Sequence, residues 1–396
     1  MQNKSQTFIW SDGWWIEGTK AWFICGTSNT LFCVDMNIGK CEKVVCVPDE
    51  GEGTYRLNPY CVKCGRDIYC IPGSGQSIWI YNLDDKTFIE LNIKKLPRRQ
   101  QHGSQYWVLD DKLFIIVGNW NRVIEVNTDQ GTISDYYIIC ENDSICCGVL
   151  AEDNIYALSS KSCKIYQFDI LTKKVKTHLL PGIKKRLAGI CFDGERFWLS
   201  GYENEVYVWD REKGNLTTIN FSEIFKVDCI DRDMERTTDN QVSSVFNRII
   251  AVGEYIWFIP IHERKIIYAN KQTTELSMFE IYEEDRMSAA VSRAQCIGNY
   301  ILEYVRDDRY IGLFSAKNRR ILEIDTKKLI YQWKEYYFSE QCLQQYCRIY
   351  KGIYFEGRDP LCLPAYQMEN QAKAFEKSNI DNIGMAIHTR MIQENV

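Results

Sequence analysis

The stretch VYVWDREKGN, Val206–Asn215, has the pattern of a strand that stops at an acidic residue and enters a turn. Six other segments share this pattern, and we call the acidic or amide residue that ends each strand its anchor. The anchors are Asp35, Asn82, Asn127, Asp169, Asp210, Asn270 and Asp325. Successive anchors lie 47, 45, 42, 41, 60 and 55 residues apart. Such near-constant spacing indicates a repeat architecture.

The positions before each anchor have a consistent character. The residues four, three and one before it are apolar in all seven copies, whereas the residue two before it is mixed. The mixed set is Cys33, Ile80, Glu125, Gln167, Val208, Tyr268 and Glu323. This alternation predicts a strand whose second face is only partly covered.

An aromatic-rich strand precedes the anchor strand. Thirteen residues before the anchor, six copies have an aromatic side chain and the seventh has Gly312. The six aromatics are Trp22, Tyr69, Phe114, Tyr156, Phe197 and Trp257. We expect all seven copies to hold this distance without a gap.

One more strand precedes and one follows this pair in each repeat. Four short antiparallel strands in each of seven units predict an all-β, seven-bladed β-propeller over residues 13–338. The number of blades would be six or eight if the two ends of the repeat region differ from the pattern. A parallel β-helix fits worse because its repeats are shorter, and an α-solenoid because the dominant period is two. Residues 339–396 are predicted to be a cap and a helical tail that packs on the propeller or docks on a partner.

The repeats resemble kelch and galactose-oxidase-like propellers, through an aromatic strand followed by an apolar-x-apolar-Asp/Asn strand end and a turn. The Trp-Asp pair of WD repeats occurs once in this register, at Trp209 and Asp210. The resemblance implies a propeller scaffold. It also implies that an enzyme of this kind, a lyase, cyclase or glycan hydrolase, would place its site in the central channel.

Composition narrows the classes of partner. The net charge of −5 lacks the basic footprint of a nucleic-acid-binding protein. The chain has no apolar run long enough to span a membrane, and its first residues lack the apolar core of a signal peptide. The 17 cysteines then favour reduced thiols and a cytoplasmic location.

No motif predicts a metal or a cofactor. The four histidines, at positions 102, 178, 262 and 388, do not pair at ligand spacing. The lone CxxC, Cys61–Cys64, lacks the second pair of ligands that zinc usually needs. CEKVVC and CLQQYC have looser spacing, so most cysteines are expected in the core.

The long loops are expected on one face, because connections between blades and between second and third strands share it. Arginines and aromatics gather in these loops and suit carboxylate, phosphate or sugar groups and protein hot spots. The candidate ligand-binding residues are Arg56, Tyr60, Arg99, His102, Tyr106, Trp120, Arg186, Tyr202, His262, Arg264 and Arg293. The sequence thus favours a binding or scaffold module for a protein, peptide or glycan.

The alternative is a propeller enzyme on the same face. His102 and His262 would then act as acid or base, and Arg99 and Arg264 would stabilise an anion.

Overall fold

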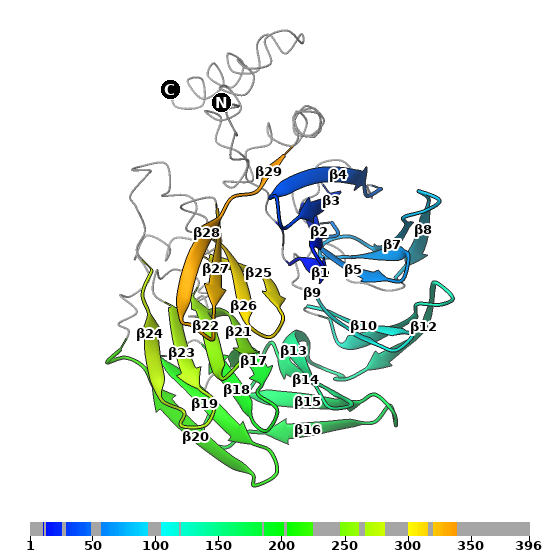
Figure 1. The fold of residues 1–396 in the computed structure, drawn as a ribbon. Coiled ribbons are helices and arrows are strands. Elements are labelled where there is room, and N and C mark those ends of the chain that lie inside the picture. Colours follow the sequence, from blue (N-terminus) through cyan, green and yellow to red (C-terminus); the bar gives the residue numbers. More distant parts are fainter. Residues whose placement is uncertain are drawn as a thin grey trace, which may run out of the picture.

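The computed structural model describes residues 11, 13–25, 29–48, 57–93, 104–118, 120–183, 186–201, 204–224, 246–260, 266–281, 300–315 and 320–338. These residues form seven antiparallel sheets arranged as blades around a common axis (Figure 1). The predicted seven-bladed propeller with four-stranded blades is confirmed. The predicted tail, residues 339–396, lies outside the described residues.

Each blade runs outward from the axis in chain order. The first, innermost strands are β1 (Trp15–Glu17), β5 (Tyr60–Cys64), β9 (Ser104–Leu109), β13 (Ile145–Ala151), β17 (Leu187–Phe192), β21 (Phe246–Val252) and β25 (Tyr300–Arg306). The second strands are β2 (Lys20–Cys25), β6 (Asp67–Ile71), β10 (Lys112–Val117), β14 (Asn154–Ser159), β18 (Phe197–Gly201), β22 (Tyr255–Pro260) and β26 (Tyr310–Ser315).

The third strands carry the anchors, and the fourth form the outer rim. The third strands are β3 (Thr30–Asp35), β7 (Ser77–Asn82), β11 (Arg122–Asn127), β15 (Lys164–Asp169), β19 (Glu205–Asp210), β23 (Ile266–Asn270) and β27 (Arg320–Asp325). The fourth strands are β4 (Lys40–Cys46), β8 (Phe88–Asn92), β12 (Thr132–Ile138), β16 (Val175–Leu179), β20 (Asn215–Asn220), β24 (Leu276–Phe279) and β28 (Ile330–Lys334).

The ring closes between the seventh and the first blade. A last strand, β29 (Tyr337–Phe338), pairs in parallel with β4 and adds a fifth strand to the first blade (Figure 1). Near the axis, the backbone N–H of Trp14 donates to the carbonyl oxygen of Glu303 at 2.6 Å. The Trp14 ring stacks on Phe23 of the first blade and contacts Tyr304 of the seventh. Backbone pairing and aromatic packing therefore join the seventh blade to the first.

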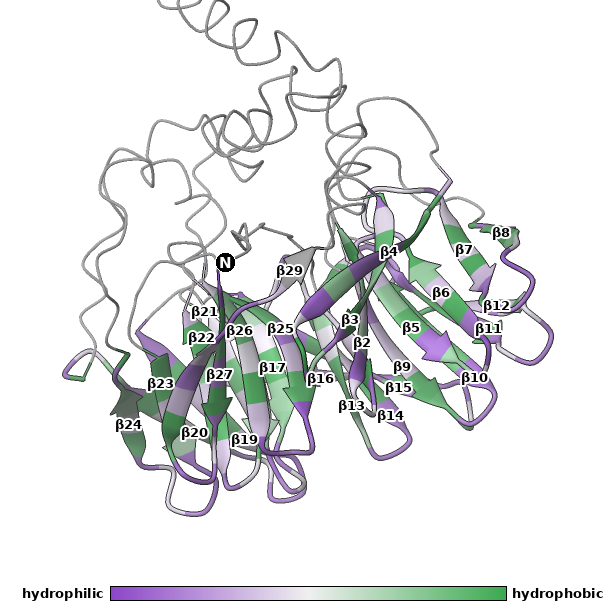
Figure 2. Ribbon diagram, turned by 45° about the horizontal axis from the view of Figure 1, so that its top comes forward, coloured by the Kyte–Doolittle hydropathy of each residue, from purple (hydrophilic) through white to green (hydrophobic). Residues whose placement is uncertain are grey.

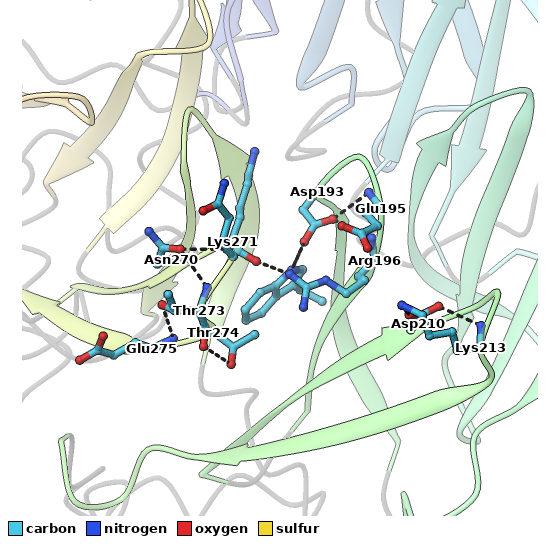
Figure 3. Close-up of polar contacts among 12 residues, drawn as sticks. Asp193, Glu195, Arg196, Asp210, Lys213, Asn270, Lys271, Thr273, Thr274 and Glu275 are labelled. Atoms are coloured by element: carbon cyan, nitrogen blue, oxygen red, sulfur yellow. Dashed lines mark hydrogen bonds and ion pairs between the residues drawn. The ribbon is translucent and has the colours of Figure 1, made fainter.

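All seven anchors end the third strand, as predicted, and each caps the turn that follows. The side-chain oxygen of each anchor accepts a backbone N–H from two or three residues further on. Figure 3 shows two of these caps, in which Asp210 accepts from the backbone N–H of Lys213 and Asn270 accepts from that of Thr273. Short polar side chains suit this role because they imitate a backbone acceptor.

The fourth residue after every anchor has a left-handed backbone. This set comprises Gly39, Lys86, Gly131, Lys173, Gly214, Thr274 and Leu329, with φ between 54° and 70°. A turn followed by one left-handed residue is a common hairpin connection, because its twist suits the flanking strands. These hairpins lie on a hydrophilic rim beneath the mainly hydrophobic strands (Figure 2).

Hydrophobic clusters fill the space between neighbouring blades. On β7, β11, β15, β19 and β23, the position four before the anchor faces the next blade, and the positions three and one before it face the previous blade. The prediction of a partly covered face holds for Cys33, Gln167 and Tyr268. It is wrong for Ile80, Glu125, Val208 and Glu323, which are buried. The next blade packs against Ile80 and Val208 and supplies Lys173 to Glu125, whereas Glu323 contacts Tyr304 and Arg306 of its own blade.

The fifth blade breaks the predicted constant distance between its second and third strands. In the other blades the anchor pairs with the residue fifteen positions earlier, as in Lys20 with Asp35. In the fifth blade Trp198 pairs with Val208, so the register is shifted by one residue. Trp198, rather than Phe197, therefore packs against the sixth blade. The prediction that all seven copies keep the same distance is wrong at this blade.

Polar contacts hold the shifted blade in place. The indole N–H of Trp198 donates to Asp193 at 2.7 Å. The guanidinium of Arg196 lies 3.5 Å from Asp193 and donates to the carbonyl oxygen of Lys271 in the sixth blade (Figure 3). Arg196 thus bridges two blades.

Of the residues that the structure describes, none forms a helix long and apolar enough to span a membrane.

Candidate functional site

The first residues of the inner strands meet at one end of the propeller axis. Consecutive inner strands contact one another around most of the ring, and the first contacts the last. Each connection from an outer strand to the next inner strand arrives at this end, which is therefore the long-loop face. Among the polar side chains at this end, Arg248 acts on Tyr106 and Cys147, and Arg186 acts on Cys146, which is hydrogen-bonded to Cys147. We call these five residues the axial cluster.

A β-bulge near the start of three consecutive inner strands shapes this cluster. The pairing register shifts between Ile145 and Cys147 in β13, and between Leu187 and Gly189 in β17. It shifts at the equivalent place in β21, before Arg248. A bulge inserts one residue and changes the direction of the side chains around it, and bulges are enriched next to functional sites.

The bulge in β13 brings two thiols together. The Sγ atoms of Cys146 and Cys147 lie 3.8 Å apart. Cys146 Sγ lies 3.7 Å from the carbonyl oxygen of Leu187, and Cys147 Sγ lies 3.3 Å from that of Ala188. Both thiols therefore point toward β17 of the fifth blade, and both residues keep part of their surface exposed.

Hydrogen bonding and the two arginines set the ionisation of this pair. A hydrogen bond from the Cys147 thiol lowers the pKa of Cys146 against the effect of burial, and the charge of Arg186 lowers it further. The same hydrogen bond and burial raise the pKa of Cys147, with Arg248 acting in the opposite direction. Of the two thiols, Cys146 is therefore the one that loses its proton first.

Tyr106 is a fixed neutral donor in the cluster. Its hydroxyl donates to the carbonyl oxygen of Cys61 in the second blade at 2.9 Å. Burial is the main reason that the pKa of Tyr106 is raised, and the charge of Arg248 opposes this rise. Tyr106 therefore supports the site rather than supplying an ion.

Arg248 has a different environment. The side chain is partly exposed, and its charge acts on Cys147 and Tyr106. Within the described part of the chain, no carboxylate forms an ion pair with Arg248. The cluster can therefore attract an anion or stabilise a thiolate.

The structure brings two of the predicted site residues, Tyr106 and Arg186, into the axial cluster. Tyr60 and Trp120 instead lie in the core between the second and third blades, 3% and 6% exposed. Trp120 packs edge-on against Tyr136. The other predicted residues lie outside the described ranges: Arg56, Arg99, His102, Tyr202, His262, Arg264 and Arg293.

Sequence reasoning missed Cys146, Cys147 and Arg248. The adjacent cysteines were a readable signal, but in a regular strand their side chains would point to opposite faces. Only the bulge places both on one side, and nothing in the local sequence identifies it.

The CxxC sequence does not form a chelating pair. Cys61 is buried in the cluster between the first and second blades, whereas Cys64 packs against the cluster between the second and third. Burial raises the pKa of Cys64 to about 11. In the described ranges, no group of three or more His, Cys, Asp or Glu side chains is arranged to hold a metal ion. No disulfide joins two of the described cysteines.

Comparison with known proteins identifies the fold and no family. No family model matches the chain, and no curated protein matches its sequence. Among solved structures, the chain is similar to a catalytically inactive virginiamycin B lyase from Staphylococcus aureus, solved with quinupristin. The TM-score is 0.55 at 13% identity, over 82% of this chain and 96% of the lyase.

Two further structures have the same architecture. The computationally designed Ika8 protein gives a TM-score of 0.53 at 8% identity, over 85% of this chain and 89% of the design. PorZ, a component of the type-IX secretion system of Porphyromonas gingivalis, gives 0.53 at 8% identity. That match covers 84% of this chain but only 39% of PorZ. At these identities the likeness concerns the fold alone.

Proposed function

We propose that this propeller is a binding module, and that its protein, peptide or glycan ligand presents a carboxylate or phosphate to the axial cluster on the long-loop face. The observation that carries this proposal is Arg248, which is partly exposed and has no carboxylate partner in the described ranges. A guanidinium can bind a carboxylate or phosphate through two parallel hydrogen bonds, and Arg186 adds a second positive charge at the same end of the axis.

The scaffold supports this function because it is rigid beneath variable loops. Inner strands packed around the axis carry Arg248 and Tyr106. Long connections between blades can then supply further contacts. Arg99, His102 and Arg264 belong to these connections and remain predicted ligand contacts.

Thermal unfolding with inorganic phosphate or citrate at constant ionic strength tests the anion site. A ligand that binds only the folded protein stabilises it by about 2.7 kcal/mol at one hundred times its dissociation constant. We expect citrate to raise the unfolding temperature of the wild type, and Arg248→Gln to abolish the rise. Arg66→Gln is the matched control, because Arg66 is an exposed arginine at a hairpin turn of the second blade. An equal shift in wild type and Arg248→Gln would refute the site.

A propeller enzyme is the second candidate. It is favoured by the positive charge at the axis together with His102 and His262, which lie in long-loop connections. The similar lyase was solved with quinupristin, so quinupristin is a suitable first substrate to assay. Time-dependent loss of quinupristin that disappears in both His102→Ala and His262→Ala would favour the enzyme. Binding of an anion without turnover would favour the binding module.

Membership of the kelch and galactose-oxidase-like superfamily remains a prediction from the repeat pattern. The cytoplasmic location and the docking role of residues 339–396 also remain predictions.

A further inference from the structure

The Cys146–Cys147 pair has a geometry that a regular strand cannot produce. Successive side chains of a strand point to opposite faces, which would keep adjacent thiols apart. The bulge between Ile145 and Cys147 removes this alternation, and the two Sγ atoms lie 3.8 Å apart. Both thiols contact consecutive carbonyl oxygens of β17, so they share one environment.

The surroundings favour thiolate chemistry over cation binding. Arg186 acts on Cys146 and Arg248 acts on Cys147, and two positive charges stabilise a thiolate while they repel a metal ion. The pair offers only two sulfur ligands, whereas a structural zinc site has four protein ligands. Each residue as a whole is half-buried, so opening of this end of the inner strands by a small amount would admit a small reagent to the sulfur atoms.

We propose that Cys146 and Cys147 form an oxidisable vicinal dithiol, which closes to a disulfide when the protein meets a peroxide and reopens when it meets a dithiol. The Cys146 thiolate attacks one oxygen of the peroxide, the O–O bond breaks, and hydroxide or alkoxide leaves. Cys146 is then a sulfenic acid. The Cys147 sulfur attacks the sulfur of this sulfenic acid, its thiol proton and the sulfenic hydroxyl leave as water, and the disulfide forms. The two electrons lost by the thiols reduce the peroxide.

The local geometry also explains why this disulfide would be reversible. Adjacent Cα atoms are about 3.8 Å apart across a trans peptide, which is below the usual range of about 4.4–6.8 Å for disulfides. A strained disulfide is more easily reduced, and strained or exposed disulfides are those that act as labile or regulatory bonds. This site is therefore suited to switching rather than to permanent crosslinking. The inference is independent of the anion site and needs no ligand for its test.

Mass spectrometry of the full chain tests the proposal directly. The reduced protein is treated with one equivalent of hydrogen peroxide, its free thiols are blocked with N-ethylmaleimide, and its peptides are mapped. We expect Cys146 and Cys147 to be lost together from the blocked pool, in one peptide that carries an internal disulfide. Dithiothreitol should restore both thiols. Preferential oxidation of any other cysteine pair would overturn the proposal.

Single substitutions separate the two roles. In Cys147→Ser, Cys146 should form a sulfenic acid that dimedone traps, because the resolving thiol is missing. In Cys146→Ser, Cys147 should react at least about tenfold more slowly than Cys146 does in the wild type, because burial still raises the pKa of Cys147. Cys46→Ser is the control, since Cys46 is an exposed single thiol, and its peptide map at Cys146 and Cys147 should be unchanged. Equal dimedone labelling of Cys146 and Cys46 in the Cys147→Ser variant would refute a special reactivity of the pair.

A trivalent arsenical gives a second readout that does not depend on oxidation. Phenylarsine oxide binds two neighbouring thiols, so the reduced wild type should bind one equivalent with an affinity that each single serine variant loses at least about tenfold, since one thiol remains. Unchanged affinity in both variants would show that the arsenical, and hence the dithiol, lies elsewhere.

Discussion

The ring of Tyr304 lies directly over Gly312, so that a Cβ atom at Gly312 would overlap the ring. Tyr304 comes from the inner strand of the seventh blade, and its hydroxyl donates to Glu323 on the third strand at 2.8 Å. The tyrosine thus crosses the second strand at the one place where that strand has no side chain. It fills the space that an aromatic of the second strand occupies in other blades.

The first prediction concerns the packing of the Tyr304 ring over Gly312. Gly312→Ala should lower the free energy of unfolding by about 1–3 kcal/mol, because the new methyl group forces Tyr304 out of a packed site. Urea denaturation measures the difference. Tyr304→Phe is the comparison, since it keeps the ring and loses only the hydrogen bond to Glu323, at a cost of about 1 kcal/mol.

A double substitution tests whether an aromatic ring at position 312 can occupy the space that the ring of Tyr304 fills. Tyr304→Ala with Gly312→Phe restores the arrangement of the third blade, in which Phe114 occupies this position. The double variant should lose less unfolding free energy than the sum of the two single losses, by at least about 1 kcal/mol. Purely additive effects would contradict this replacement of one ring by the other.

The propeller could be predicted from sequence because its rules are local. Each anchor stops its own strand and caps its own turn, so the repeat can be read without a structure. The glycine at position 312 was visible as an exception, but its reason was not, because Tyr304 comes from another strand. The register shift at Trp198 and the bulge at Cys146 are also invisible, since both depend on how strands pair. Of the axial cluster, the residues predicted from sequence therefore include Tyr106 and Arg186, but not Arg248 or the two thiols.

The left-handed position after each anchor gives the second prediction. Lys86 is exposed and has φ of 57°, a conformation that costs a residue with a side chain about 1–2 kcal/mol. Lys86→Gly relieves this strain, but a glycine loses more conformational entropy on folding. The free energy of unfolding should therefore rise by about 0.5–1 kcal/mol. Gly214→Ala is the reverse control, because a Cβ there meets no atom within 4 Å and only the backbone strain is added. It should destabilise by a similar amount, and a gain in stability would refute the argument.

An ion pair between blades gives the third prediction. Glu125 is 4% exposed, and its carboxylate lies 2.5 Å from Lys173 of the next blade and 2.9 Å from Lys112 of its own. The Lys173 ammonium also lies 4.7 Å from the centre of the Tyr137 ring. Lys173→Met keeps the side-chain volume but leaves part of the buried carboxylate without a donor. Equilibrium unfolding should show a loss of about 1.5–3 kcal/mol. In the Glu125→Gln background the same substitution should cost less, and an equal cost would exclude the pair.

Deletion of the chain end gives the fourth prediction. The described ring is closed by β29 and by Trp14, which both precede residue 339. We therefore expect a chain that ends at Met368 to keep the circular dichroism spectrum and unfolding temperature of the full protein. A pull-down from cell extract with both chains then asks whether residues 369–396 capture a partner. Loss of folding would instead show that this segment packs on the propeller.

The pH dependence of the Glu125 pair gives the last prediction. Burial alone would raise the pKa of Glu125, but the hydrogen bonds from Lys173, Lys112 and Tyr137 together lower it. A carboxylate whose pKa is lower in the folded state stabilises the protein fully above its unfolded pKa, which is about 4.3. That stabilisation is lost as the pH falls through the folded pKa. The stability difference between wild type and Lys173→Met should therefore be constant from pH 7 to pH 5 and shrink toward pH 3. A difference that grows on acidification would show that protonated Glu125 is the form that Lys173 stabilises.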